Sequence, residues 1–600
     1  GWVFANGDIL TMTPYVFALP LTWLMGIGLA SNAWSTWLAY LSMLAGVWYL
    51  LRRLRPAGSA DRAGDWTVLA MTASMFSVAA YEFGVRQGAY TMYAAVLMPL
   101  LALLFARPGN GRAVLAFLIG ALLASSNPMR AAVLILAPLL LAIIADGILP
   151  SHAVALGQRW ALLRSRTLWG TLAGGLAGTL VYYYWLLPGL QNYDAAANIS
   201  GPTSASVLAA LQSILPDARD YTTAGMSWEH IGNGQRLLQL LVWGIWLASL
   251  AAPGLVLLRR RTPPQLRLLA WLSYAMLAAG ILPLLVTQGL YTSHSELRYA
   301  SLAMLMSWVV LGLSLARGYL LPGRAANFAL GAISLVAMVT AMSWSQYRTT
   351  RNPTYEGLSA NSAELISVLR KDEVGTAAAS YWNSHVISVL SNGAVMVNPI
   401  GYSAPRMAPF PHHSPLAPLS GTAGSRHAII LTRDELQSDD GRLLHWQLGE
   451  PWKRHDLGVY VVLVYQRPVV DEIYGVGARF DAPVAAQSVA LGLDDLKLQP
   501  CHAQTPCRVS VEAENLGTRA ISSAGELPLR VGLQGLAADG SLVQNDLGRM
   551  EFPRPLYPGE TVLLEATLLP MDNEVAAIRP CLLQEGVAWL CDRTQVRADP

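Results

Sequence analysis

The sequence predicts a polytopic α-helical membrane domain followed by two extracytoplasmic domains, an α/β domain and a β-sandwich. Of the 600 residues, 53% are hydrophobic and only 13% are charged, against about 25% charged in an average soluble domain. The first 344 residues contain repeated apolar runs, and all four cysteines lie after residue 500. These observations disfavour a single soluble domain, and the net charge of +3 gives no support to a nucleic-acid partner.

The apolar runs define the membrane domain, residues 1–344. Eleven runs approach the about 17–25 residues that a helix needs to cross a bilayer. They cover residues 14–30, 35–51, 66–82, 90–106, 113–126, 131–149, 168–187, 237–258, 268–289, 299–316 and 328–344.

Basic residues between the runs predict the orientation. One set of alternate loops carries fifteen arginines: Arg52, Arg53, Arg55, Arg62, Arg107, Arg112, Arg159, Arg164, Arg166, Arg259, Arg260, Arg261, Arg267, Arg317 and Arg324. The opposite loops carry five: Arg86, Arg130, Arg219, Arg236 and Arg298. The positive-inside rule assigns the first set to the cytoplasm. We therefore expect a multi-pass protein of the cytoplasmic (inner) membrane whose domains after Trp344 are periplasmic or otherwise extracytoplasmic.

The tail changes pattern near residue 470. Residues 345–470 alternate helical and strand-like runs, which predicts a small α/β domain. Residues 471–600 contain short alternating strands between Gly, Pro and Asp turns, which is typical of a β-sandwich.

The cysteines support an exported tail. An even number in a strand-rich extracytoplasmic region indicates two disulfides, and the local pairing of Cys501 with Cys507 and of Cys581 with Cys591 is one of three connectivities. A zinc site is disfavoured because the segment CHAQTPC lacks close CxxC spacing.

One outer hairpin, SHSELRY at 293–299, concentrates polar groups beside the membrane. It contains His294, Glu296, Arg298 and Tyr299. Arginine offers a planar donor fork and stays charged, so Arg298 suits a lipid phosphate at the headgroup boundary. The alternative is that Arg298 extends to the interface or pairs with Glu296 as a solvated cap.

Two further outer groups are candidates. Glu82 and Arg86 are spaced i,i+4, which fits a functional role or a simple helix-end pair. The segment SSNPMR places Pro128 between two apolar runs and Arg130 at the start of the second. Such a break frees backbone groups that need a partner, although a tight outer turn also explains it.

Three stretches resemble the GT-C superfamily of polyprenyl-phosphate-sugar-dependent glycosyltransferases, which includes protein O-mannosyltransferases and lipid A aminoarabinose transferases. Residues 6–54 resemble its Gly-Asp turn, Pro-led apolar helix and following span that ends in Arg-Arg. Residues 115–141 are similar to its helix broken by a Pro and a basic residue, and residues 296–308 to its late helix that opens with Arg-Tyr.

The resemblance implies a topology of about ten spans. The run 14–30, which contains Pro20, then becomes a juxtamembrane helix, and Asp8 lies in the first outer loop. The opening residues contain no initiator Met, so we expect the sequence to begin inside a longer product, with a preceding span and the family's usual acidic pair upstream.

The resemblance also implies an activity. Family members use a first-loop carboxylate to take the proton from an acceptor hydroxyl, which attacks the sugar and displaces polyprenyl phosphate with inversion. Here Asp8 is the candidate base and Glu82 the second choice. Arg298 is the leading phosphate ligand, followed by Arg130, Arg86 and Tyr299, while His294 and Glu296 are further site candidates.

The implied partners are a polyprenyl-phosphate sugar, membrane lipids and an extracytoplasmic glycan, lipid or protein acceptor. Some relatives use a divalent metal, but no ligand set in this sequence demands one. The tail also resembles an immunoglobulin-like adhesion or carbohydrate module. Two alternatives stay open: a non-catalytic membrane subunit that presents its outer domains to an envelope assembly, and a polysaccharide polymerase, ligase or lipid-linked transporter.

Overall fold

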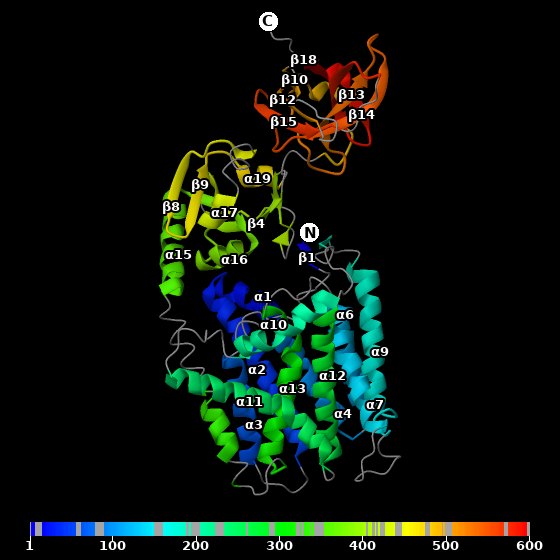
Figure 1. Cartoon of the computed structure of the whole chain (residues 1–600), viewed down its shortest axis with the longest axis vertical. Coiled ribbons are helices and arrows are strands. Elements are labelled where there is room, and N and C mark those ends of the chain that lie inside the picture. The colour runs from blue at the N-terminus through cyan, green and yellow to red at the C-terminus, as the bar shows by residue number, and fades with distance from the viewer. Residues whose placement is uncertain are drawn as a thin grey trace. The chain divides into compact units, whose positions relative to one another are not determined.

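A computed structural model describes most of the chain, and the chain divides into two compact units. The residues outside the description are 1, 6–14, 56–61, 79–88, 108, 149–159, 188–190, 194–203, 223–232, 260–261, 287–293, 320–324, 326–328, 338, 341–352, 404–405, 411–413, 416–417, 421–425, 439–446, 475–479, 495, 499–506, 569–573 and 597–600. The helical unit is Phe4–Gly357, and the second unit comprises Gly1–Val3 and Leu358–Pro600. We call the second the C-terminal unit and describe each by itself (Figure 1).

The helical unit is built from helices in nearly every described segment. They are α1 (Tyr15–Met25), α2 (Leu29–Leu54), α3 (Arg62–Val78), α4 (Ala89–Leu104), α5 (Asn110–Ser126), α6 (Pro128–Ala131), the π-helical η3 (Ala132–Leu136), α7 (Ala137–Ile148), α9 (Arg166–Val181), the π-helical η4 (Tyr182–Leu186), α10 (Ser204–Thr222), α11 (Asn233–Leu258), α12 (Pro264–Val286), the 3-10 helix η7 (His294–Ala300) and α13 (Ser301–Ala316). Short strands are β2 (Gln191–Tyr193) and the end of β1 (Trp2–Ala5), whose residues Trp2 and Val3 belong to the C-terminal unit.

Four helical segments are long and apolar enough to cross a membrane. Among the described residues they are Pro128–Ile148, Arg236–Leu258, Pro264–Leu285 and Leu297–Ala316. Several other predicted runs form shorter helices, such as α1 with 11 residues and α4 with 16. The helix α2 has 26 residues, but its Ser, Trp and Tyr side chains lower its mean hydropathy. The prediction of an N-terminal helical region is thus confirmed, with four candidate spans among the described residues.

The helix α13 is the centre of the helical unit. Every residue from Ser301 to Leu315 is buried, and the helix packs against α3, α11 and α12. Trp308 ties it to a neighbour, since its indole Nε1 donates to the Met71 carbonyl of α3 at 2.6 Å. A helix that is apolar all round is the pattern of an element enclosed by other elements.

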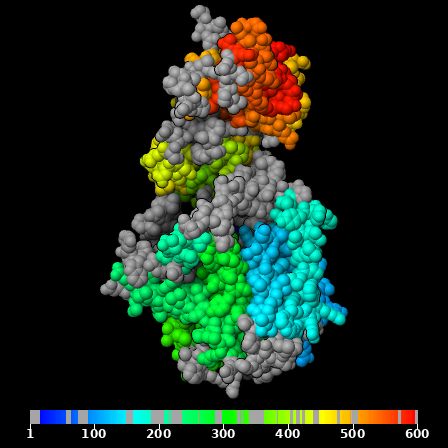
Figure 2. Space-filling view, turned by 45° about the vertical axis from the view of Figure 1, so that its right-hand side comes forward, coloured from blue at the N-terminus to red at the C-terminus, as the bar shows by residue number. Residues whose placement is uncertain are grey.

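Glycines bring α5 and α9 into direct backbone contact. Gly170, Gly174 and Gly178 recur every four residues on α9, and a Cβ at any of them would overlap the carbonyl oxygen of Ala113, Phe117 or Ala121 on α5. α5 and α9 pack against each other, and Figure 2 shows α9, in cyan, beside segments coloured blue. Small residues at this spacing are a common way for membrane helices to approach each other closely.

The first part of the C-terminal unit is an α/β domain around a six-stranded sheet. The strand order is β5 (Arg406–Pro409), β4 (Met396–Ser403), β3 (Val374–Ser380), β7 (Arg426–Thr432), β9 (Tyr460–Tyr465), β8 (Lys453–Leu457). β3 pairs in parallel with β4 and β7, and the other pairs are antiparallel. The helices are α15 (Pro353–Lys371), α16 (Tyr381–Leu390), α17 (Arg433–Ser438) and α19 (Val469–Ile473). The central β3 and β7 are apolar and buried, as expected for strands covered on both faces. The short β6 (Ser414–Pro415) pairs with β1 outside this sheet.

The second part of the C-terminal unit consists of two sheets that share one core. One sheet contains β10 (Leu491–Leu493), β11 (Lys497–Leu498), β12 (Arg508–Asn515), β15 (Thr561–Thr567) and β18 (Thr594–Val596). The other sheet has the strand order β14 (Leu542–Glu551), β13 (Leu529–Leu536), β16 (Ala577–Gln584), β17 (Ala588–Leu590). This part of the chain also contains the short 3-10 helices η8 (Ala486–Ser488) and η9 (Cys591–Arg593). Alternate residues of β12 are buried, so one face of this strand points into the core.

The prediction of α/β and β-sheet domains after the helical region is confirmed. The Cys581–Cys591 disulfide is present between β16 and η9, and Cys507 is also disulfide-bonded, whereas Cys501 lies outside the described residues. Disulfides persist in oxidising compartments. They are therefore consistent with an extracytoplasmic location of this domain.

Candidate functional site

Several arginines that the sequence assigns to the cytoplasm lie at one end of the helical unit. The Arg317 guanidinium, after α13, donates to the Leu54 carbonyl at the end of α2, 2.6 Å away. Arg166 at the start of α9 bonds Asn110 at the start of α5 at 2.8 Å. Because these contacts join chain segments that the sequence places on one side, they agree with the predicted sidedness of the loops.

Two ion pairs complete this end. Arg55, after α2, pairs with the buried Asp65 of α3. Arg267 of α12 pairs with Asp146 of α7, and its Nε donates to a carboxylate oxygen at 2.8 Å. The two acidic groups neutralise arginines that pack against the bundle, so these pairs have a structural role.

The predicted phosphate ligand Arg298 lies in η7, where α13 begins. Leu297 and Ala300 on either side are 1% and 0% exposed, so they anchor the segment in the bundle. Arg298 itself is half-buried, and its guanidinium lies 5.5 Å from the ring centre of Tyr299. The Tyr299 ring in turn meets the edge of Tyr90 at 6.3 Å. These contacts hold a cation beside an aromatic pair.

Arg298 is separated from the arginine-rich end by the length of α13. The apolar segment Leu297–Ala316 has 20 residues, which corresponds to about 30 Å of helix. This is close to the thickness of the bilayer hydrocarbon core. Arg298 and Arg317 therefore mark the two ends of one membrane-length helix.

The break before Arg130 has a defined local cause. The side chain of Asn127 caps α6 by accepting the Arg130 backbone N–H at 2.8 Å, and Pro128 occupies the first turn, where no intrahelical donor is needed. The π-helical η3 follows directly. Arg130 is half-buried on α6, which packs against α5 and α9, whereas η7 packs against α10, α12 and α13.

Of the remaining predicted site residues, the structure describes only the backbone of two. Asp8, Glu82 and Arg86 lie outside the described residues. His294 and Glu296 belong to the backbone of η7, but their side chains are outside the description. Within the described residues, no group of three or more His, Cys, Asp or Glu side chains forms a metal site.

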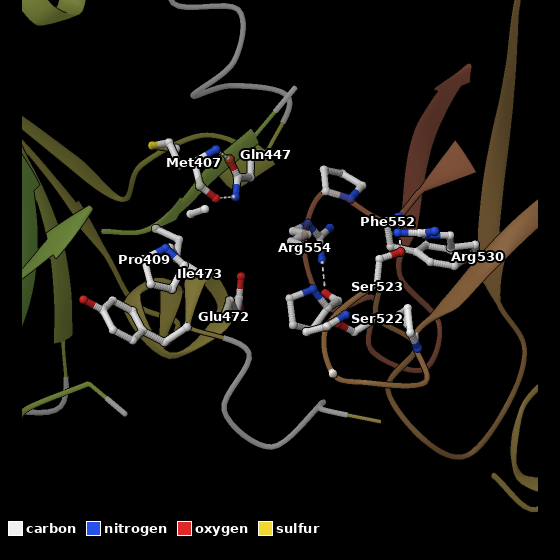
Figure 3. A pocket seen from close by; sticks show the side chains of 17 residues that line it. Met407, Pro409, Gln447, Glu472, Ile473, Ser522, Ser523, Arg530, Phe552 and Arg554 are labelled. Carbon is white, nitrogen blue, oxygen red and sulfur yellow. Dashed lines mark hydrogen bonds between the residues drawn. The ribbon is translucent and has the colours of Figure 1, made fainter. Parts of the chain in front are cut away.

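Sequence reasoning missed two polar sites in the C-terminal unit. Asp372, at the end of α15, binds Lys453 at 2.8 Å and His455 at 2.5 Å. The alternation of Lys453 and His455 on β8 is the signal that places both on one face of the strand. The second site is a cavity beside Glu472, at the end of the α/β domain (Figure 3). Nothing in the local sequence around Glu472 indicates it, because its walls come from distant segments.

The pKa shifts in this unit follow from burial and partners. Burial alone would raise the pKa of Asp372, but the hydrogen bonds from Lys453 and His455 outweigh it and lower the pKa. Burial lowers the pKa of His427, against the nearby charge of Asp471. The His427 Nδ1 accepts the Val470 N–H at 3.3 Å, which fits a neutral imidazole.

No family model matches the chain, and no curated protein matches it.

Proposed function

We propose that this chain is an integral-membrane glycosyltransferase that moves a sugar from a polyprenyl-phosphate donor to an extracytoplasmic glycan, lipid or protein. The observation that carries the proposal is the position of Arg298. This cation is half-buried at one end of the enclosed, membrane-length helix that carries Arg317 at its other end. A phosphate at the headgroup boundary would meet such a group without crossing the bilayer.

The proposal extends the membrane topology beyond the four apolar segments. The continuous helical stretch of α9 and η4, Arg166–Leu186, measures about 31 Å at 1.5 Å per residue. Its exposed Tyr184 and Trp185 are the residue types that gather at membrane interfaces. We include it among about ten spans, with α1 as a juxtamembrane helix, in the cytoplasmic membrane.

Exposed apolar side chains on α1 support that placement. Leu19, Trp23 and Leu24 are 74%, 85% and 70% exposed, and an 11-residue helix is too short to span the hydrocarbon core. Lipid at the interface would cover these side chains. In this proposal the α/β domain and the immunoglobulin-like module lie on the acceptor side of the membrane.

In the proposed reaction, a carboxylate takes the proton of the acceptor hydroxyl, and the hydroxyl oxygen attacks the anomeric carbon. The bond from that carbon to the phosphate oxygen breaks, and polyprenyl phosphate leaves with the bonding electrons. Asp8 is the proposed base and Glu82 the second choice. Arg298 stabilises the negative charge on the departing phosphate, with Tyr299 holding its guanidinium. Arg130 and Arg86 are secondary phosphate ligands.

The test is transfer from synthetic polyprenyl-phosphate sugars in reconstituted vesicles. We expect Arg298→Ala to lower the transfer rate by about 10²–10³-fold, because a preorganised cation is lost from the leaving group. Arg298→Lys should recover part of the rate. The matched control is Arg53→Ala, which removes an exposed arginine from the opposite end of the unit.

Two results would contradict the proposal. Unchanged transfer by Arg298→Ala would remove the proposed phosphate site, and equal loss in Arg53→Ala would show that the effect is structural. Asp8→Asn and Glu82→Gln, measured in the same assay, distinguish the two proposed bases.

A further inference from the structure

The helix α10 packs at the end of the helical unit where Arg298 lies. It contacts η7, α11 and α12, and Figure 1 labels α10 and α1 at the upper end of this unit. Its apolar part, Val207–Ala218, is about 18 Å long at 1.5 Å per residue. Because the hydrocarbon core is about 30 Å thick, this helix is too short to be a span.

One side of α10 carries two exposed leucines. Ala210 is 7% exposed and packs inward, whereas Leu208 and Leu211 are 56% and 49% exposed. The two leucines are three positions apart, so they are neighbours on the helix surface. Ala209 and Ser213 are also exposed, and their i,i+4 spacing places them together on another side. The exposed surface of α10 therefore has a strongly apolar side and a side of small residues.

The neighbours of α10 indicate the depth of these leucines. η7 contains the start of the apolar segment Leu297–Ala316, so an element packed on η7 would lie near the boundary between hydrocarbon and headgroups. The candidate span Arg236–Leu258 belongs to α11, which also packs against α10. Its first turns expose Leu237 and Leu240, 70% and 51%, on a surface that lipid would cover. Acyl chains are thus the apolar medium available to the leucines of α10.

The charges of α10 favour an apolar attachment to the lipid. Between Ser204 and Thr222 the sequence contains one arginine, Arg219, and two aspartates, Asp217 and Asp220. Helices that bind anionic headgroups electrostatically are rich in Lys and Arg on their polar face. The sequence of α10 does not have such a face, so its affinity for lipid would come from the burial of leucine side chains.

We propose that α10 is an interfacial helix whose Leu208 and Leu211 side chains insert into the acyl chains below the lipid headgroups. The occupant of this surface is the membrane leaflet at the Arg298 end of the helical unit. The inference requires that the helical unit lies in a membrane, but it does not depend on the transfer reaction in the proposed function.

The experiment attaches a nitroxide label to single cysteines of the full chain in phosphatidylcholine nanodiscs. It measures collisions of the label with oxygen, which concentrates in acyl chains, and with a water-soluble nickel chelate. We expect labels at Leu208→Cys and Leu211→Cys to lie about 5–10 Å into the headgroup–acyl boundary, as interfacial helices do. Ser213→Cys is the matched control and should collide mainly with the nickel chelate. The chain without an added cysteine measures background labelling.

A pair of second substitutions tests whether the leucine side causes the insertion. Leu208→Asp should move the label at Leu211→Cys toward water and lower its ratio of oxygen to nickel collisions, because a charge is costly among acyl chains. Ala209→Asp adds the same charge on the other side and should leave the ratio unchanged. Adding phosphatidylglycerol to the nanodiscs should not change the depth, since the attachment is apolar.

Three results would each overturn the proposal. Frequent nickel collisions at both leucine positions would show that this side faces open water. Few collisions with either reagent would show that protein covers it, such as a second copy of the chain. Insertion only in nanodiscs that contain phosphatidylglycerol would show electrostatic attachment. None of these measurements uses sugar transfer, so failure of the proposed function would leave them unaffected.

Discussion

At the scale of single residues, the Asp372 carboxylate has two basic partners on one strand. It is 4% exposed and binds both Lys453 and His455. The backbone carbonyl of Asp372 also accepts a hydrogen bond from Arg426 at 3.0 Å. The cluster joins the end of α15 to the edge strand β8. We regard it as a structural connection, because among the described residues no nucleophile contacts the Asp–His pair.

Replacing Asp372 tests this role. We expect Asp372→Asn to lower the local free energy of unfolding by about 1.5–3 kcal/mol, since hydrogen bonds to a charged group are lost. Hydrogen exchange of the β8 and β9 amides at pH 7 should then become about 10–100-fold faster. The control is Asp456→Asn, which removes an exposed pair with Arg454 and should change exchange little.

The wild type and Asp372→Asn also test how the stabilising contribution of Asp372 depends on pH. The pKa of Asp372 is lowered in the folded state, so its contribution is present above the unfolded pKa of about 3.9 and is lost as the pH falls through the folded value. The difference between wild type and Asp372→Asn should therefore shrink below about pH 4. A difference that grows on acidification would contradict this assignment.

At the scale of elements, the α5–α9 pair depends on the absence of side chains at three glycines. We expect Gly174→Leu to destabilise the helical unit by about 1–3 kcal/mol, because the new side chain would overlap the Phe117 backbone. The Tm in detergent should fall accordingly.

The matched control is Gly244→Ala on α11. A Cβ at Gly244 meets no atom within 4 Å, and replacing a helical glycine by alanine removes a propensity cost of about 1 kcal/mol. Its Tm should therefore stay or rise. Equal Tm values for Gly174→Leu and the wild type would show that the close helix contact is not required.

At the scale of the whole molecule, the distribution of arginines over alternate loops predicts a direction across the membrane. We expect a cysteine at Ser59, between α2 and α3, to resist an impermeant thiol reagent added outside right-side-out vesicles. A cysteine at Ser541, an exposed turn position between β13 and β14, should react readily. The wild type measures the background, and rapid labelling at Ser59 would invert the orientation.

Much of the architecture was predictable because it depends on local pattern. Apolar runs such as 299–316 form helices, since a segment of that length and composition satisfies its backbone within itself. The near neighbours Cys581 and Cys591 form a disulfide, as their short separation favours. The number of spans was less predictable, because α2 has enough residues but a mixed apolar and polar surface.

The predicted site residues also include features that the sequence could indicate and features that it could not. Arg298 was identifiable as a cation at the membrane end of an apolar run, because sequence position fixes depth along a helix. Its partner Tyr90 was not, since the Tyr90–Tyr299 contact joins α4 to η7 across the bundle. The glycine face of α9 carried a readable small-residue signal. The partner helix, however, is a matter of tertiary packing.

The sequence by itself predicted an apolar helical region followed by α/β and β-sheet domains with a local disulfide, because hydropathy and cysteine spacing act over short stretches of chain. Only the tertiary structure decided that α13 is the enclosed helix, that Asp372 meets β8, and that the buried Glu472 pairs with Arg467 beside a cavity. Those features depend on contacts between residues far apart in the chain. No local pattern encodes such contacts, because each requires the other elements to be packed first.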